Sequence, residues 1–403
     1  EFGVQMLMAE LTEDTILAQG APGATLIGQQ TRRGVLDAAL VNGTAAHALD
    51  FDDVHFDMPG HPTVAIMPAV VALAEREGAT LDAALDAYIT GVEAACAVGR
   101  FMTHSHYSRG WHATGTVGAI GAAVASARLL KLDAASTARA MGLAISQCGG
   151  LKSMFATMCK PMHAGRAAHT GLLAARLAAR GFTAREDMLE CAQGFAAVFD
   201  GASDTEAALV GLGAPHAIAG VLFKYHAACY GTHAGIDAML MLREQHDFDA
   251  DAVAKVELTV PAENLQICDI KQPSTGLEAK FSMTHTAAMA LCGIATGDTE
   301  NYSEAVCEAP NVVRLRDRIR VEADPSEFRA VASATVHLND GVALHTHADV
   351  SVAETDLERQ ARRLREKFML LARPILGANA ALVADVVLDG APTMAVASIF
   401  ENF

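Results

Sequence analysis

The chain has 403 residues, of which 51% are hydrophobic and 19% charged, and its formal net charge is -17. This much apolar sequence can bury a core, which excludes an intrinsically disordered chain. The acidic balance argues against binding to nucleic acid or to an anionic membrane surface, and no apolar run of about 18 residues is present to span a bilayer.

The eight cysteines are scattered singly and never form a C-x-x-C pair. This distribution argues against a disulfide framework or a zinc ribbon, and it predicts a reducing, cytoplasmic setting.

The first half of the chain has the apolar spacing of successive helices, with Ala and Gly interleaved so that helix axes can approach closely. The predicted helices are Val64–Arg76, Leu81–Arg100, Thr116–Leu130, Ala134–Gln147 and Met162–Arg180.

The pattern changes near Lys224. Val253–Val260 alternates like a strand, and Asn339-Asp340-Gly341 is a hairpin turn signal. An amphipathic helix returns at Asp356–Ala372. We therefore predict a mainly α protein, with an all-helical domain over 1–223 and 356–403 and a smaller α+β domain over 224–355.

The first motif that could carry chemistry is the stretch 42–62, in which an apolar helix runs into Asp50, Asp52 and Asp53, followed by His61. Carboxylates at a helix C-terminus interact unfavourably with the helix dipole. A sequence that keeps several of them there is expected to use them in its function. A solvated acidic loop is an equally good explanation from composition alone. A metal site is a further reading, but the spacing matches no standard ligand pattern, and we predict no metal.

The second motif, residues 104–121, offers Tyr107 as an acid/base phenol, Arg109 as a carboxylate clamp and His112 as a neutral imidazole. Its glycines recur every third position, which favours tight helix packing over a dinucleotide site.

The third motif is Cys159-Lys160-Pro161-Met162-His163, followed by Arg166. Pro161 suits a helix start, which would place Lys160 at the cap against the positive end of the dipole and poise it as a base. His163 and Arg166 share a helical face suited to an anion, although an ordinary solvated helix start would look the same. The stretches 224–233 and 280–285 would support no claim by themselves.

These stretches together resemble the MmgE/PrpD family, which includes 2-methylcitrate dehydratase, cis-aconitate decarboxylase and iminodisuccinate epimerase. The similarity covers most of the chain and rests on N-G-T-A-A-H-A-L-D-F-D-D at 42–53, G-W-H-A-T-G-T-V-G at 110–118, K-P-M-H-A-G-R-A-A at 160–168 and A-K-F-S at 279–282.

The resemblance implies a large helical domain, a smaller α+β lid, a homodimer, and an active site between the two domains that uses no cofactor. The functional positions that it carries over are Asp50, His61, His112, Lys160 and His163.

Two departures speak against the decarboxylase branch, because Val54 stands where that branch has Thr and His285 where it has Tyr. The resemblance is therefore closest to the epimerase branch. We expect a cofactor-independent epimerase of a small, iminodisuccinate-type dicarboxylate, in which Lys160 and Tyr107 exchange the α-proton. Asp50 would orient a neighbouring His or Lys. The substrate carboxylates would be held by His61, His112, His163, Arg109, Arg166 and His285.

Two alternatives remain open at this point. One is a lyase of the 2-methylcitrate dehydratase or cis-aconitate decarboxylase type, acting on a tricarboxylate. The other is a helical scaffold that binds a ligand without catalysis.

Overall fold

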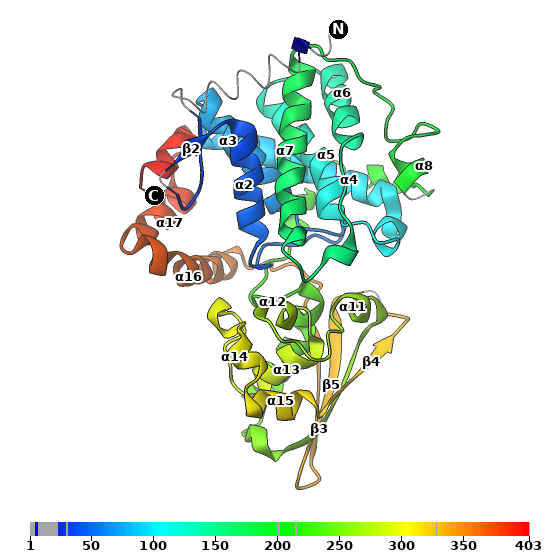
Figure 1. Ribbon diagram of the computed structural model, residues 1–403, viewed down its shortest axis with the longest axis vertical. Coiled ribbons are helices and arrows are strands. Elements are labelled where there is room, and N and C mark those ends of the chain that lie inside the picture. Colours follow the sequence, from blue (N-terminus) through cyan, green and yellow to red (C-terminus); the bar gives the residue numbers. More distant parts are fainter. Residues whose placement is uncertain are drawn as a thin grey trace.

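The structure is a computed structural model that describes residues 5–6, 23–29, 31–199, 202–213, 216–327 and 329–402. A helical body occupies the upper part of Figure 1, and a smaller body of helices and one sheet, which we call the lid, lies below it. This arrangement confirms the predicted fold class of a mainly α protein with a smaller α+β part.

From Ala24 onward, the helical body has a short antiparallel pair of strands followed by helices. Its elements are β1 (Ala24–Thr25), β2 (Arg32–Arg33), α2 (Val35–His47), α3 (Pro62–Glu77), α4 (Leu81–Ser108), α5 (Ala113–Leu129), α6 (Ala134–Ile145), α7 (Cys159–Ala179), α8 (Phe195–Phe199) and α9 (Thr205–Leu209).

Helix α5 lies at the centre of this body and is buried at every residue from Ala113 to Ala127. Close packing depends on its glycines. A Cβ on Gly118 would stand 2.6 Å from the Cβ of Ala65, and one on Gly121 would stand 2.8 Å from Cδ1 of Ile66. The prediction that the spaced glycines serve helix packing is therefore confirmed.

The lid contains a four-stranded sheet in the order β4-β3-β5-β6, with β3 parallel to β4 and the other pairs antiparallel. Val256 and Leu258 of β3 are fully buried in a core that they share with α10 and α13. The elements of the lid are α10 (His233–Gln245), β3 (Val253–Pro261), α11 (Ala262–Ile267), α12 (Gly276–Ala279), α13 (Met283–Leu291), α14 (Glu304–Cys307), α15 (Pro310–Arg316), β4 (Ile319–Asp324), β5 (Val331–Leu338) and β6 (Ala343–Asp349).

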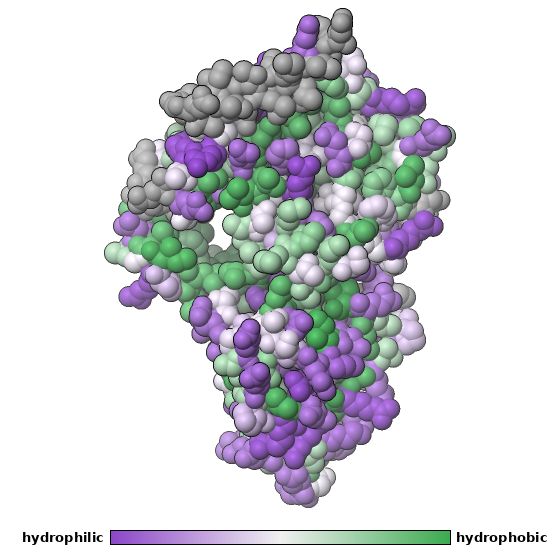
Figure 2. All heavy atoms as spheres, viewed as in Figure 1, coloured by the Kyte–Doolittle hydropathy of each residue, from purple (hydrophilic) through white to green (hydrophobic). Residues whose placement is uncertain are grey.

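The chain then returns to the helical body through α16 (Leu357–Leu376) and α17 (Asn379–Asp389). Helix α16 buries none of its residues. Figure 2 shows a mainly hydrophilic surface over the lower end of the lid, whereas apolar residues such as Ile375 and Leu388 stay exposed on α16 and α17. None of the helices described is long and apolar enough to cross a membrane.

Two helix boundaries differ from the sequence prediction in ways that matter for the site. Helical geometry resumes after Thr103, whose φ is 58°, so that α4 runs to Ser108 and Tyr107 lies on a helix and not in a loop. Helix α7 begins at Cys159, which places Lys160 inside the first turn and not at the cap. Pro161 is tolerated there because the first N–H groups of a helix have no intrahelical partner.

Candidate functional site

The polar cluster lies where the C-terminal end of α2 meets the start of α3, α5 and α7, beside the first residues of the lid segment. The chain leaves α2 through Asp50, whose φ is 51°. Asp tolerates this left-handed conformation better than most residues, and the turn directs its carboxylate into the protein. Asp50 is only 2% exposed.

Two lysines meet this carboxylate, and we call Asp50, Lys160 and Lys224 the ion set. Oδ1 of Asp50 lies 2.8 Å from Nζ of Lys160 and 2.7 Å from Nζ of Lys224. Nζ of Lys224 also donates to the backbone oxygen of Asp50 at 2.8 Å. Burial would raise the pKa of Asp50, but the two ammonium groups outweigh it and hold that pKa well below its usual value. The carboxylate is therefore ionised.

A second carboxylate fixes the orientation of two imidazoles. Nδ1 of His47 lies 2.9 Å from both oxygens of Asp52, and Nδ1 of His61 lies 3.0 Å from Oδ2 of Asp52. Since an ionised carboxylate only accepts hydrogen bonds, both rings carry a proton on Nδ1, and in the neutral form of each ring Nε2 keeps a lone pair. Burial lowers the pKa of His47 to about 4, so this ring is neutral near pH 7.

Two more imidazoles complete what we call the imidazole group, which is His47, His61, His112 and His163. Nδ1 of His112 and Nδ1 of His163 are 3.0 Å apart, and Nε2 of His163 lies 3.6 Å from Sγ of Cys159. Burial, followed by the charge of Lys160, lowers the pKa of His112 well below its usual value. Nε2 of His47 and Nε2 of His112 are buried without a hydrogen-bond partner among the described residues.

Asp53 lies three residues after Asp50, but its carboxyl group has different hydrogen-bond partners and a different pKa. Thr63 donates to it through its backbone N–H at 3.2 Å and through Oγ1 at 2.5 Å, and that hydroxyl is also 2.5 Å from the Tyr88 hydroxyl. Burial raises the pKa of Asp53 to about 7, against the lowering effect of the Thr63 hydrogen bonds. Asp53 is thus half protonated near neutrality.

Tyr107 lies in the last turn of α4, and Cys229 lies in the segment between Lys224 and α10. The ammonium of Lys152 lies 3.8 Å above the centre of the Tyr107 ring. Burial, then the nearby Cys229 and Cys268, raise the pKa of Tyr107 well above its usual value, so its phenol stays protonated.

Three members of the imidazole group could in principle share a metal ion. Ligand atoms of His47, His61 and His112 lie within 4.8 Å of one another. Such nitrogens suit zinc, but the nearby ammonium of Lys160 would repel a divalent cation.

The residues predicted from the sequence divide into two sets. The structure brings Asp50, His61, His112, Lys160 and His163 together in the cluster, with Tyr107 beside it. Arg109 and Arg166 have exposed side chains and lie outside the buried cluster. The ring of His285 is buried in the lid core, where burial and the neighbouring Arg316 lower its pKa to about 4.

Sequence reasoning missed His47 and Lys224, which both contact the carboxylates of the cluster. His47 could have been found from its place three residues before Asp50, on the last turn of the helix that feeds the acidic run. Lys224 is 174 positions from its partner Asp50, and no local sequence pattern predicts that contact.

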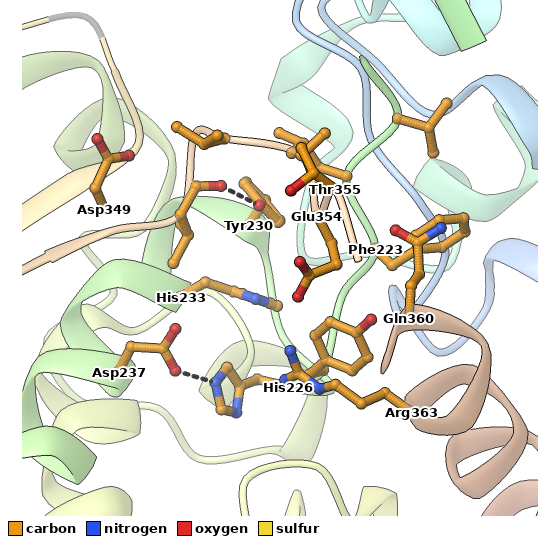
Figure 3. A pocket seen from close by; sticks show the side chains of 16 residues that line it. Phe223, His226, Tyr230, His233, Asp237, Asp349, Glu354, Thr355, Gln360 and Arg363 are labelled. Atoms are coloured by element: carbon orange, nitrogen blue, oxygen red, sulfur yellow. Dashed lines mark hydrogen bonds and ion pairs between the residues drawn. The ribbon is translucent and has the colours of Figure 1, made fainter. Parts of the chain in front are cut away.

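A separate cavity of about 400 Å³ lies where the lid joins the helical body. Figure 3 shows His226 paired with Asp237 on one side, Arg363 of α16 nearby, and Glu354 directed inward beside His233. Both stretches that connect the two bodies line it, through Phe223 and through Thr355.

Comparison with known proteins identifies the family of the chain. Residues 7–208 match the MmgE/PrpD N-terminal domain, and residues 226–389 match the MmgE/PrpD C-terminal domain. The cis-aconitate decarboxylase of Homo sapiens is 28% identical over 358 residues, which cover 84% of this chain and 73% of that protein. The corresponding values for the Mus musculus protein are 28% over 361 residues, 84% and 72%. A cis-aconitate decarboxylase of Aspergillus terreus (strain NIH 2624 / FGSC A1156) is 30% identical over 240 residues, 56% of this chain and 49% of that protein. With both of its domains matched over most of its length, the chain belongs to the MmgE/PrpD family.

Proposed function

We propose that this enzyme performs acid–base chemistry at the carbon next to a carboxylate of a small dicarboxylate, with epimerisation of an iminodisuccinate-type substrate as the result. One observation carries the proposal: neutral imidazoles with free Nε2 atoms lie beside ammonium groups held by Asp50. The ammonium groups can bind carboxylates, and the imidazoles can remove a proton from the adjoining carbon.

Lys160 is better suited to stabilise negative charge than to act as the base that its sequence position suggested. Its ammonium is paired with ionised Asp50 at 2.8 Å and lies 4.9 and 5.0 Å from the ring centres of Phe155 and Phe281. We therefore assign to Lys160 the stabilisation of the enolate that forms when the α-proton leaves.

His61 is the base that the geometry favours. Its Nδ1–H is held by the backbone oxygen of Asp53 at 2.7 Å and by Asp52, which leaves the Nε2 lone pair directed toward the ion set, 4.0 Å from Oδ1 of Asp50. A ring fixed in this tautomer can accept a proton without first rotating.

Epimerisation also needs an acid that returns the proton to the opposite face of the carbon. Tyr107 fits this role because its phenol stays protonated, and the charges of Asp50 and Cys229 both act on it. The proposal thus keeps the predicted pair of opposing groups but replaces Lys160 by His61 as the base.

Decarboxylation or dehydration of a tricarboxylate is the second candidate, and the named relatives favour it. Against it stand the two departures seen in the sequence. Val54 is only 8% exposed and is paired through its backbone with Leu222, and His285 lies in the lid core. Neither position offers the cluster the hydroxyl group that the decarboxylase branch has there.

The experiment is to incubate the enzyme in deuterated water, separately with an iminodisuccinate-type dicarboxylate and with cis-aconitate, and to follow both by NMR. The proposal expects deuterium at the α-carbon with inversion, without loss of water or of CO2. Release of CO2 or formation of an alkene would contradict the epimerase and support the lyase.

Two variants test the assignment of the residues. His61→Gln should lower turnover by about 10²–10⁴-fold, the usual effect of removing a general base. Tyr107→Phe should abolish inversion but retain exchange of the α-proton. Full epimerisation by Tyr107→Phe would refute the two-face mechanism, even if the reaction class stands.

A further inference from the structure

Three side chains of the site form a continuous chain of polar contacts. Cys159 is the first residue of α7 and is partly exposed, and His163 follows one helical turn later on the same face. Sγ of Cys159 lies 3.6 Å from Nε2 of His163, which is within hydrogen-bond distance for sulfur. Nδ1 of His163 lies 3.0 Å from Nδ1 of His112, the residue that precedes α5. The two nitrogens of the His163 ring thus join the thiol to His112.

Two glycines pack closely against His163. Gly150 has a φ of 137°, and a Cβ added to it would stand 3.1 Å from both Cγ and Nδ1 of His163. A Cβ added to Gly115 would stand 3.3 Å from Cβ of His163. The backbone oxygen of Gly150 also accepts the N–H of His112 at 3.0 Å. This close packing favours one orientation of the His163 ring, with Nδ1 toward His112 and Nε2 toward Cys159.

The thiol decides which way the hydrogen bonds run. Burial is the main cause that lowers the pKa of His112 and of His163, so each ring is neutral near pH 7 and has one N–H and one lone pair. An imidazole nitrogen is a better acceptor than a thiol sulfur, which favours donation by the S–H of Cys159 to Nε2 of His163. His163 then carries its proton on Nδ1 and donates to Nδ1 of His112. The proton of His112 is left on its Nε2.

Nε2 of His112 is the atom at which this chain of contacts ends. His112 is only 1% exposed, and its Nε2 has no hydrogen-bond partner within the part of the chain that the structure describes. A buried polar atom without a partner is unfavourable unless a ligand or a water meets it. The charge of Lys160 acts on the same ring. An N–H at this position, near an ammonium group, suits a carboxylate oxygen.

We propose that Cys159 is a positioning residue, whose thiol acts through His163 to make Nε2 of His112 a hydrogen-bond donor to a substrate carboxylate. His61 has the opposite tautomer, because Asp52 accepts from its Nδ1 and leaves a lone pair on Nε2 in the neutral ring. The site thus holds one imidazole that can take a proton and one that binds an anion. The substrate carboxylate rests on the proposed function, whereas the tautomers of His112 and His163 do not.

The test is ¹⁵N NMR of the whole protein labelled at histidine, which shows which nitrogen of each neutral ring carries the proton. His112→Gln and His163→Gln assign the two sets of signals. At pH 7 we expect Nε2–H in His112 and Nδ1–H in His163. A proton on Nδ1 of His112 would overturn the proposal.

Variants of Cys159 test whether the thiol sets these tautomers. Cys159→Ala removes the donor, so the proton of each ring should distribute over both nitrogens. Cys159→Ser should keep the tautomers of the parent, because a hydroxyl group can also donate to Nε2 of His163. Cys159→Asp should reverse them, because an ionised carboxylate only accepts. Unchanged tautomers in both Cys159→Ala and Cys159→Asp would overturn the role of the thiol.

Cys292→Ala is the matched control. Cys292 is also a partly exposed cysteine, and it lies in the lid, at the C-terminal end of α13. Its replacement should leave the signals of His112 and His163 as they are in the parent. A change as large as that in Cys159→Ala would mean that the tautomers respond to any loss of a thiol, and would contradict the specific role of Cys159.

Titration with succinate, a simple dicarboxylate, tests the contact with the carboxylate. In the parent, the Nε2–H proton of His112 should shift downfield as succinate binds. If the two tautomers are equally populated in Cys159→Ala, its apparent affinity should fall about twofold, because only one of them is competent to bind. An Nε2–H signal that does not respond to succinate would refute the contact and leave the tautomer assignment standing. If no turnover is found with any substrate, the NMR spectra still decide the role of Cys159.

Discussion

The surroundings of Asp50 and of Asp53 differ although the two residues lie in one loop and are 2% and 5% exposed. Asp50 contacts two ammonium groups and is ionised. Asp53 contacts the neutral side chain of Thr63, and its pKa rises to about 7, with burial as the main cause. Burial acts on both in the same direction, so the contacting cation decides which carboxyl group carries charge. We assign the charged one to the proposed chemistry, and the one with the raised pKa to the support of the loop.

Asp50→Asn should produce the largest change, because it leaves the fully buried Lys224 without its carboxylate. Breaking a buried ion pair from one side typically costs about 3–5 kcal/mol. Urea denaturation at pH 7 would measure the loss.

Because the folded pKa of Asp50 lies below the unfolded one, its stabilisation is present above the unfolded value and is lost as the pH falls through the folded value. The difference between parent and variant should therefore shrink in acid. Asp57→Asn is the control, since the side chain of Asp57 is 41% exposed and pairs with Arg100 at 2.6 Å; its loss should stay under about 1 kcal/mol. An equal loss in both variants would contradict the assigned role of the ion set.

Asp53→Asn should change the pH dependence of stability in the opposite sense. The pKa of Asp53 is near 7 in the folded protein and lower in the unfolded chain. Between these two values the folded carboxyl group holds a proton that the unfolded one has released. The parent therefore loses stability as the pH rises through this interval. An amide has no such proton. Relative to the parent, the variant should gain on the order of 3 kcal/mol between pH 4 and pH 8.

Thermal unfolding of both proteins over that pH interval measures the difference, in which titrations shared by the two, such as that of His47, cancel. A constant difference would show that Asp53 is ionised in the folded protein.

Thr63→Val should have the smallest effect of the three. It removes the hydroxyl between Asp53 and Tyr88. Leaving a buried neutral group without its hydrogen-bond partner costs about 1–3 kcal/mol. Chemical denaturation below pH 6, where Asp53 is protonated, gives the cleanest value. Thr90→Val is the control, because the Thr90 hydroxyl makes an exposed bond to the backbone oxygen of Asp86. A Thr63→Val loss as large as that of Asp50→Asn would mean that Asp53 is charged and needs its partner.

Much of the fold follows from local pattern. The strand Val253–Pro261, the hairpin turn at Gly341 and helix α16 with Asp356 as its N-cap lie where alternation, turn residues and amphipathic spacing place them. Each of these signals is contained within a short stretch of chain, and for that reason sequence reasoning found them.

The site follows from local pattern only in part. Asp50, His61, His112 and Lys160 are recognisable because each lies in a motif whose polar residues would be costly without a use. Lys224 lies in no such motif, because its role comes from the contact with Asp50 that the tertiary fold creates. The exposed side chain of Arg166 shows the reverse error: its charge suits a carboxylate, but its helix turns it to solvent.

The contact between Asp50 and Lys224 also affects how the protein folds during its synthesis on the ribosome. Asp50 is synthesised long before Lys224, and both lysines that neutralise it must emerge before its carboxylate can be enclosed at low cost. A nascent helical body that lacks the lid segment would therefore keep this loop open to water. Completion of the helical body should await the first residues of the lid, so the two bodies are one unit of assembly although they are two units of architecture.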